Sequence, residues 1–265
     1  MPGADLRAVY DERAQEYVYR GRHARPSRKQ RGVIAHLPVL DGLRFLEVGC
    51  GDGPYLAWAS RTHRRPHDTR PPGAMLRQSG SPFAVVGIDI SPRILHEARQ
   101  RVWHGGQPEI AYLAAADAVA LPFPDAWFDV LLASQVIEHV PDDARALREM
   151  RRVLRPGGTL VISTDHRDNR VSRALAAPTL AVRRLLGRAV YRPPFLHRSY
   201  GRAEFVNKLR KAGFTVLEVC TYRFSWPSRL GRVRLLTRLL DILEERLIRY
   251  QPWSEWGDML LVVAR

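Results

Sequence analysis

The sequence predicts an α/β fold built on a doubly wound, mostly parallel sheet. Short apolar runs alternate with amphipathic segments along most of the 265 residues, and this alternation is typical of repeated strand–helix–strand units. Two of the runs, at residues 45–48 and 85–89, end at a glycine-rich turn and at an acidic residue, respectively. The length and the hydrophobic content of 45% are sufficient for one core, so we expect a single domain over residues 1–265.

Each expected element follows from a local pattern. Strands are predicted at residues 44–48, 85–89, 109–113, 130–133, 159–163, 214–220 and 258–264, where apolar and β-branched residues cluster. Helices are predicted at residues 5–20, 26–38, 54–60, 92–103, 145–154, 202–212 and 232–249, with a further helix entered after Ser134. Ser91 can cap the helix at 92–103, and the turn at 156–158 should end the helix at 145–154. Residues 61–82 are rich in proline, glycine, arginine and histidine, which predicts an insertion loop remote from the chemistry.

The glycine turn after the first strand indicates a nucleoside-binding site. Residues 45–53 read FLEVGCGDG, and glycines let the backbone approach a ligand because no Cβ stands in the way. Asp89, at the tip of the second strand, can accept hydrogen bonds from a ribose diol. The third glycine of a dinucleotide-binding fingerprint is missing, and a carboxylate at Glu47 would repel a pyrophosphate but suits a sulfonium or an amino group. These features argue against NAD.

These residues resemble the class I S-adenosylmethionine-dependent methyltransferases. Residues 137–140 (IEHV) and 155–158 (RPGG) are similar to segments of the ubiquinone/menaquinone-biosynthesis-like branch, methyltransferase type 11. The resemblance implies a Rossmann-like seven-stranded sheet with a C-terminal antiparallel hairpin, helices on both faces and an N-terminal helical cap at residues 1–40. It also implies S-adenosyl-L-methionine as the cofactor and S-adenosyl-L-homocysteine as the product.

The resemblance assigns cofactor-binding residues position by position. The implied set is Glu47, Gly49, Cys50, Gly51 and Gly53 around the methionine portion and ribose, Asp89 on the ribose hydroxyls, Ile90 on the adenine, Asp117 and Ala118 at the adenine amino group, Ser134 and Gln135 at the methionine moiety, and Tyr17 near the cofactor. Asp117 also fits a helix or turn cap. Tyr17, like Tyr10, can instead pack against the edge of the sheet.

The resemblance implies no universal catalytic residue, because methyl transfer from a sulfonium needs mainly alignment and the exclusion of water. The candidates are His139, His197 and Tyr200. His139 can act as a general base near neutral pH, or it can be a hydrogen-bonded residue at a helix start. His197 and Tyr200 either contact the acceptor or anchor a substrate lid, expected at residues 166–200, to the sheet.

The charge pattern leaves several partners open. The net charge is +15, yet only three of the 42 basic residues are lysines, a bias that GC-rich coding also produces. A basic amphipathic stretch within residues 166–200 suits an amphiphilic or phosphate-bearing acceptor, a membrane surface or plain core packing. Basic clusters also attract nucleic acid. No Asn/Asp-Pro-Pro-Tyr motif follows the fourth strand, which argues against amino methylation of DNA bases.

The sequence therefore predicts a methyltransferase for a small-molecule or lipid-like acceptor, at an O, N or C atom. A tRNA or rRNA methyltransferase and a non-catalytic S-adenosylmethionine-binding scaffold are the alternatives. The only cysteines, Cys50 and Cys220, fall at a strand end and in a strand, so neither a disulfide framework nor a metal site is expected. No apolar signal segment and no run of about 18 apolar residues is present, which predicts a cytoplasmic protein.

Overall fold

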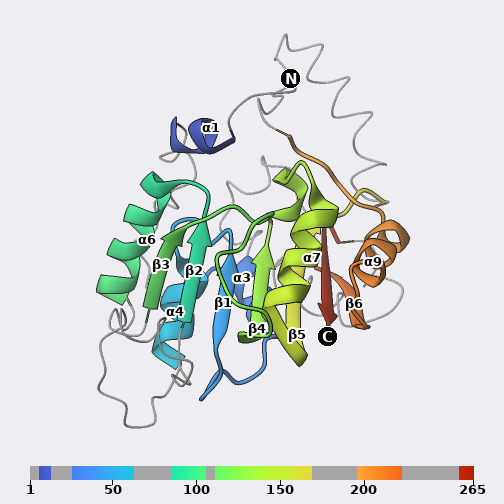
Figure 1. The fold of residues 1–265 in the computed structure, drawn as a ribbon, viewed down its shortest axis with the longest axis horizontal. Helices are drawn as coiled ribbons and strands as arrows, with labels where there is room; N and C mark the ends of the chain where they lie inside the picture. Colours follow the sequence, from blue (N-terminus) through green and yellow to red (C-terminus); the bar gives the residue numbers. More distant parts are fainter. Residues whose placement is uncertain (1–5, 13–25, 63–84, 106–110, 169–195, 223–256) are drawn as a thin grey trace, which may run out of the picture.

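Seven strands form one sheet in the computed structural model, which describes residues 6–12, 26–62, 85–105, 111–168, 196–222 and 257–265 (Figure 1). The strands are β1 (Phe45–Val48), β2 (Val85–Asp89), β3 (Ala111–Ala115), β4 (Phe128–Ser134), β5 (Leu154–Asp165), β6 (Val216–Tyr222) and β7 (Met259–Ala264). Their order across the sheet is β3-β2-β1-β4-β5-β7-β6. All neighbours pair in parallel except β7, which is antiparallel to both β5 and β6. The predicted fold class is confirmed.

Helices cover both faces of the sheet (Figure 1). They are α1 (Leu6–Glu12), α3 (Arg28–Ile34), α4 (Pro54–Thr62), α6 (Pro92–Gly105), the 3-10 turn η2 (Ile137–His139), α7 (Asp143–Val153) and α9 (Arg202–Lys211). Successive residues of a strand point to opposite faces. Phe45 accordingly belongs to the apolar cluster that includes Leu56 of α4, whereas Leu46 belongs to the cluster that includes Leu147 of α7. Burial on both faces explains why the strands read as continuous apolar runs.

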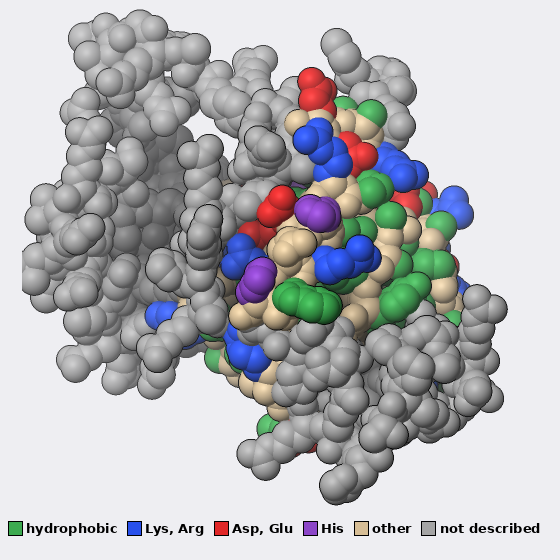
Figure 2. All heavy atoms as spheres, turned by 90° about the vertical axis from the view of Figure 1, so that its left-hand side faces the viewer, with side chains coloured by type: hydrophobic (Ala, Val, Ile, Leu, Met, Phe, Trp, Pro, Cys, Tyr) green, Lys and Arg blue, Asp and Glu red, His purple; other side chains and the backbone are tan. Residues whose placement is uncertain are grey.

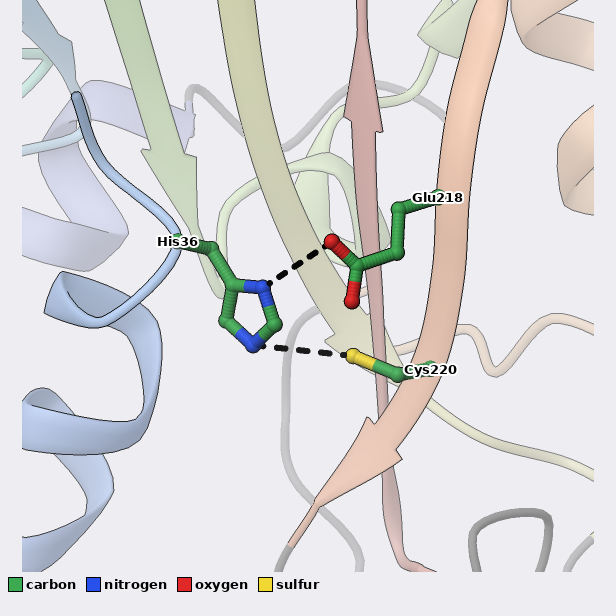
Figure 3. Close-up of side chains that lie close together, drawn as sticks. All are labelled: His36, Glu218 and Cys220. Carbon is green, nitrogen blue, oxygen red and sulfur yellow. Dashed lines mark hydrogen bonds and ion pairs between the residues drawn. The ribbon is translucent and has the colours of Figure 1, made fainter. Parts of the chain in front are cut away.

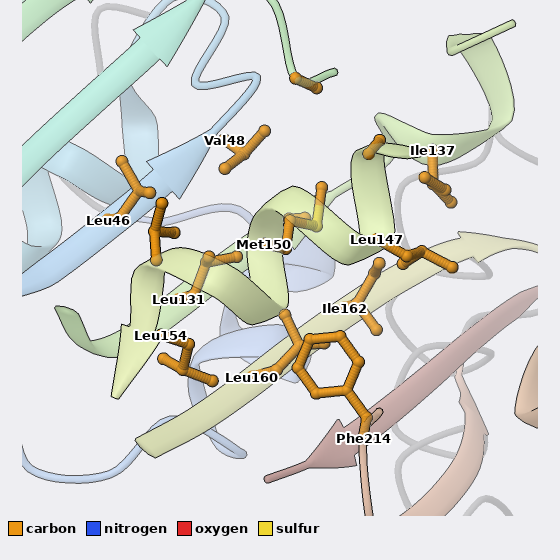
Figure 4. Packing of buried hydrophobic residues seen from close by; sticks show 14 of the residues in the cluster. Leu46, Val48, Leu131, Ile137, Leu147, Met150, Leu154, Leu160, Ile162 and Phe214 are labelled. Atoms are coloured by element: carbon orange, nitrogen blue, oxygen red, sulfur yellow. The ribbon is translucent and has the colours of Figure 1, made fainter. Parts of the chain in front are cut away.

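The core on the α7 side joins alternate strand residues to one stripe of the helix (Figure 4). Leu131 of β4 and Ile162 of β5 lie in the same cluster as Leu147 and Met150, and all four side chains are fully buried. Leu147 and Met150 are three residues apart, so they share a face of the helix. Burying each such side chain stabilises the fold by about 2 kcal/mol. This packing fixes the position of β4, whose carboxyl end contributes to the site described below.

Two boundaries differ from the sequence prediction. β5 begins at Leu154 rather than at residue 159, because Leu154 is buried and pairs with Phe128 ahead of a shift in register. The glycine turn at 156–158 therefore lies inside this strand, and α7 ends directly before it at Val153. The helix predicted to be entered after Ser134 is only the 3-10 turn η2, Ile137–His139.

Other boundaries moved by a few residues. The helix predicted at 26–38 ends at Ile34, and the strand predicted at 109–113 is described from Ala111 to Ala115. The predicted helix at 232–249, nearly all of the 61–82 insertion and most of the 166–200 lid lie outside the described residues. Among the helices that the structure describes, none has the length and apolar character needed to cross a membrane.

Candidate cofactor and active site

A cavity of about 730 Å³ lies at the carboxyl ends of β1, β2 and β4. Open parallel sheets bind ligands at this edge, where the turns after the strands meet. The predicted site residues along its wall are Glu47, Gly49, Cys50, Gly51, Asp89, Ile90, Asp117, Ala118, Ser134, Gln135 and His139. Gly53 is not part of this wall, and Tyr17 lies outside the described residues, while Tyr10 does line the cavity.

The glycines of the turn after β1 serve two different purposes. Gly49 has φ +68°, and a Cβ there would lie only 2.3 Å from Cγ2 of Val136. Gly51 also has a positive φ but faces open space on the cavity wall. A Cβ at Gly53 would lie 3.0 Å from Cβ of Ala98, so Gly53 permits α4 to begin close against α6. Gly49 and Gly51 therefore shape the cavity, and Gly53 shapes the helix packing behind it.

Glu47 presents a buried carboxylate to the cavity. Its side chain is only 2% exposed, and Oε2 has no hydrogen-bond partner among the described residues. Burial raises the pKa of Glu47 well above its usual range, and the nearby carboxylates of Asp52 and Asp89 raise it further. An unsatisfied buried acid is costly, and a cationic ligand would compensate it. The ammonium and sulfonium groups of S-adenosylmethionine supply such a charge, so the residues present fit this cofactor.

Asp89 is held by the backbone of two turns. Its Oδ2 accepts a hydrogen bond from the N–H of Gly51 at 2.9 Å, and its Oδ1 accepts one from the N–H of Ser91 at 3.0 Å. Each carboxylate oxygen has a second lone pair. Burial raises the pKa of Asp89, while these backbone donors oppose the shift. The carboxylate is thus fixed in orientation on the cavity wall before any ligand arrives.

Asp117 caps a turn and also lines the cavity. Its Oδ1 accepts a hydrogen bond from the N–H of Val119 at 3.1 Å, which is the capping role that the sequence left open. The side chain is exposed. A carboxylate in this position can still accept from an exocyclic amino group through its other oxygen. Its contact with adenine stays a prediction.

The end of β4 is joined to residues that the sequence analysis did not single out. Gln135 has φ +60°, uncommon for a residue with a side chain, and its Oε1 accepts a hydrogen bond from Nζ of Lys29 at 3.2 Å. Ser134 Oγ lies 3.0 Å from Ser163 Oγ and 3.2 Å from the hydroxyl of Tyr55. Lys29 and Tyr55 both line the cavity. Lys29 is 106 residues away from Gln135, so no local pattern could have indicated this pair.

His139 brings an imidazole to the cavity wall. Its Nδ1 lies 3.0 Å from the carbonyl oxygen of Leu196; because a carbonyl only accepts, Nδ1 carries the proton of the neutral ring. The lone pair is then on Nε2. Burial lowers the pKa of His139 below its usual 6.5, and the neighbouring His197, with ring centroids 5.1 Å apart, contributes to the shift. The ring is therefore neutral, and able to accept a proton, at physiological pH.

The other two catalytic candidates lie away from the cavity wall. His197 is exposed, and its Nε2 is 2.7 Å from Oδ2 of Asp165 at the end of β5. Tyr200 is 1% exposed, and its hydroxyl donates to Oδ2 of Asp143 at 2.8 Å. The structure thus places Tyr200 in the anchoring position that the sequence left open, between the segment at 196–200 and α7.

Glu138 was not among the sequence candidates, although it precedes His139. It is completely buried, and burial raises its pKa to about 8. Its Oε2 accepts a hydrogen bond from Oγ1 of Thr164 at 3.1 Å, and its Oε1 has no partner among the described residues. Its backbone carbonyl accepts from the N–H of Arg198. Glu138 therefore supports the backbone that carries His139, from behind the cavity.

The sheet order, the glycine turn after β1 and the acid at the tip of β2 together define a Rossmann-like fold, and solved S-adenosylmethionine-dependent methyltransferases share this fold. Residues 46–162 match the family model described as the methyltransferase domain of type 11. The match takes in 117 of the 265 residues, so this region of the chain is similar to that methyltransferase family.

Curated relatives support the same family. The 2-methyl-6-phytyl-1,4-hydroquinone methyltransferase of Synechocystis is 30% identical over 231 residues, covering 86% of this chain and 61% of that protein. The 27-O-demethylrifamycin SV methyltransferase of Amycolatopsis mediterranei is 32% identical over 126 residues, covering 48% of this chain and 40% of that protein. This chain thus spans only about half the length of the curated relatives it matches.

Solved structures show the same fold at low sequence identity. An S-adenosylmethionine-dependent methyltransferase from Mesorhizobium loti has a TM-score of 0.56 at 21% identity, covering 92% of this chain and 100% of that chain. A putative methyltransferase from Haloferax volcanii, solved with the Trm112 activator, has a TM-score of 0.62 at 20% identity. The match covers 98% of this chain and 96% of that chain.

Proposed function

We propose that this chain transfers a methyl group from S-adenosylmethionine to a hydroxyl oxygen of a small, largely apolar acceptor. The observation that carries the proposal is the neutral imidazole of His139 on the cavity wall, with its proton held on Nδ1 by the carbonyl of Leu196. A hydroxyl becomes a good nucleophile only as its proton leaves, and a neutral histidine is suited to accept that proton.

The bound cofactor would supply a methyl group on a sulfonium that is already activated for displacement. Glu47 would face the cationic part of this ligand, and Asp89 would accept from the ribose hydroxyls. Asp117 would accept from the adenine amino group. These residues bind and orient, so the remaining chemical task is to align the acceptor oxygen with the methyl group and to take its proton at Nε2 of His139.

The cavity next to His139 favours an apolar acceptor body. Val136, Val140 and Pro141 line the wall beside the imidazole. The names of several relatives agree with such an acceptor: they refer to a phytyl hydroquinone, to O-methylation in ubiquinone biosynthesis and to a demethylrifamycin. Another relative is named for the amine of phosphatidylethanolamine, so an N-acceptor must be compared directly. The base at His139 favours oxygen among these alternatives.

The described basic residues offer little support for the RNA alternative. Arg198 and Lys208 both pair with the buried Asp143, at 3.2 and 2.9 Å, and so serve the packing of the segment at 196–208. On the side of the molecule that carries α6, the described basic side chains are interspersed with acidic ones (Figure 2). Steeply salt-dependent RNA binding would be the signature of that alternative.

Two measurements test the proposal. Calorimetric titration with S-adenosylhomocysteine, with NAD in a parallel cell, should give one-to-one binding of the former alone. Methyl transfer from labelled S-adenosylmethionine should then be measured to matched phenols, aliphatic amines and RNA. Transfer to the phenol is expected. Transfer to the amine or to RNA alone would overturn the assignment of the acceptor, and binding without any transfer would favour the scaffold alternative.

A further inference from the structure

We propose that His36, Glu218 and Cys220 form a zinc-binding site on the edge of the sheet, separate from the cofactor cavity. His36 lies in the turn that follows α3, and the other two residues lie on the edge strand β6 (Figure 3). Residues two apart on a strand point to the same side, so Glu218 and Cys220 both face the imidazole. The site thus joins parts of the chain that are 184 residues apart.

The distances suit a common metal ion. One ligand atom from each of the three residues lies within 4.8 Å of the others. Nε2 of His36 is 3.8 Å from Sγ of Cys220. A tetrahedral zinc ion with ordinary Zn–N and Zn–S bonds would hold these two atoms about 3.6 Å apart. Only a small adjustment is therefore needed for both to bind one ion.

Glu218 completes the arrangement in either of two ways. Its Oε2 is 3.3 Å from Nδ1 of His36, which places the imidazole proton on Nδ1 and the lone pair on Nε2, toward Cys220 (Figure 3). A carboxylate that orients a metal-bound histidine in this way is a common partner of zinc ligands. The second carboxylate oxygen can also reach the ion, because the three groups are close together.

The charges balance a divalent cation. A thiolate and a carboxylate together carry two negative charges, and the imidazole is neutral. Zinc binding to a cysteine releases the thiol proton. Thiolate and imidazole ligands select zinc over magnesium or calcium.

The position of the site gives zinc a structural consequence. α3 meets the end of β6 at Gly32, where an added Cβ would lie 3.4 Å from the ring of Tyr222. The same helix carries Lys29 and Gln30 to the wall of the cofactor cavity. A zinc ion on His36 would fasten the end of α3 to β6 and should tighten S-adenosylhomocysteine binding. This last consequence rests on the proposed function; the metal site itself does not.

The test uses the full chain, stripped with a chelator and titrated with zinc chloride against a chromophoric competitor. One zinc per chain is expected. His36→Ala and Cys220→Ser should each weaken zinc binding by tenfold or more, and Glu218→Gln by about tenfold, as for the loss of an orienting partner. His96→Ala and Glu97→Gln, at exposed positions of α6, are the matched controls and should bind zinc as the wild type does.

Cobalt chloride gives a second readout. The cobalt form should show a thiolate-to-metal charge-transfer band that disappears in Cys220→Ser, although that variant still contains Cys50. Zinc should raise the Tm of the wild type and of the two controls but not the Tm of the three site variants, whose metal-free Tm reports whether they fold. Absence of zinc binding by the wild type, or equal binding by Cys220→Ser, overturns the proposal. Intact binding of S-adenosylhomocysteine in that event would leave the proposed function standing.

Discussion

The backbone N–H of Gly51 donates to Oδ2 of Asp89 at 2.9 Å and so joins the turn after β1 to the tip of β2. The carboxylate is consequently oriented by the protein, and a ribose would meet an acceptor that needs no rearrangement. Preorganisation of this kind reduces the cost of binding.

Asp89→Ala should weaken S-adenosylhomocysteine binding by about tenfold or more, equivalent to about 1.4 kcal/mol. The substitution removes the ribose acceptor and also leaves the N–H groups of Gly51 and Ser91 without their partner. Calorimetric titration measures the change. The control is Asp125→Ala, because Asp125 is an exposed acid that does not line the cavity. Unchanged affinity in Asp89→Ala would remove Asp89 from the cofactor site.

Gly49→Ala should be more damaging than Gly51→Ala. Both positions have positive φ, which strains any other residue by about 1–2 kcal/mol, but only at Gly49 would the added Cβ strike Val136. Thermal unfolding and cofactor titration should both show the difference. Val136→Ala should partly restore the Gly49→Ala variant, because it removes the atom that is struck. If the two glycine variants lose equal amounts of thermal stability and cofactor affinity, backbone strain alone explains the glycine at 49. The close approach to Val136 would then have no effect.

His139→Ala should lower kcat by about 10²- to 10⁴-fold and affect S-adenosylhomocysteine affinity far less. Because the pKa of His139 is below its usual 6.5, kcat/KM of the wild type should rise with pH through a midpoint below that value and then stay level near neutrality. The control is His96→Ala, on the outer face of α6. If kcat/KM of His139→Ala still rises with pH through the same midpoint, another group accepts the proton.

Glu138→Gln should make stability less dependent on pH. The folded chain keeps the proton of Glu138 up to about pH 8, whereas the unfolded chain releases it near 4.5. The stability that protonated Glu138 contributes is therefore fully present below about pH 4.5 and is lost as the pH rises to about 8. The free energy of unfolding should fall by at most about 5 kcal/mol over this range. Denaturant unfolding at several pH values measures the slope. A wild-type slope unchanged by the substitution would mean that Glu138 is ionised in the folded chain.

Tyr200→Phe should destabilise the chain by about 1–3 kcal/mol, because it removes the hydroxyl that donates to the buried carboxylate of Asp143. Asp143 keeps Lys208 and Arg198 as partners, so the decrease in the free energy of unfolding should not exceed this range. The rate of methyl transfer per folded molecule should stay near that of the wild type. A fall in kcat without a fall in Tm would return Tyr200 to the acceptor site.

The strand tips and their turns could be predicted from sequence because their signals are local. The glycines after β1 and the acid ending β2 are each encoded within a few neighbouring residues, and the parallel pairing of β1 with β2 brings the two signals together. The same local pattern predicts that Gly53 contacts the cofactor, and this stays a prediction. The structure adds that a Cβ at Gly53 would lie 3.0 Å from Cβ of Ala98, a contact between helices that no local pattern encodes.

Long-range pairs could not be predicted. Lys29 meets Gln135, and His36 meets Cys220, only after the N-terminal segment folds against the sheet. The burial of Glu138 likewise depends on β5, which supplies Thr164, and on the segment at 196–200. The early start of β5 at Leu154 reflects pairing with Phe128, which outweighs the turn preference of a proline and two glycines. Tertiary pairing decided each of these cases.

Because β7 lies between β5 and β6, the strand β6 cannot pair until β7 has been synthesised. Among the described strands, β6 is hydrogen-bonded to β7 alone, although β6 is synthesised first. A nascent chain that has released β1 to β6 from the ribosome therefore holds an unpaired edge strand until residues 259–264 emerge. If translation stalls after β6 but before β7, the intermediate is prone to aggregate through the unpaired edge of β6. Chaperone binding should be strongest at this stage of synthesis.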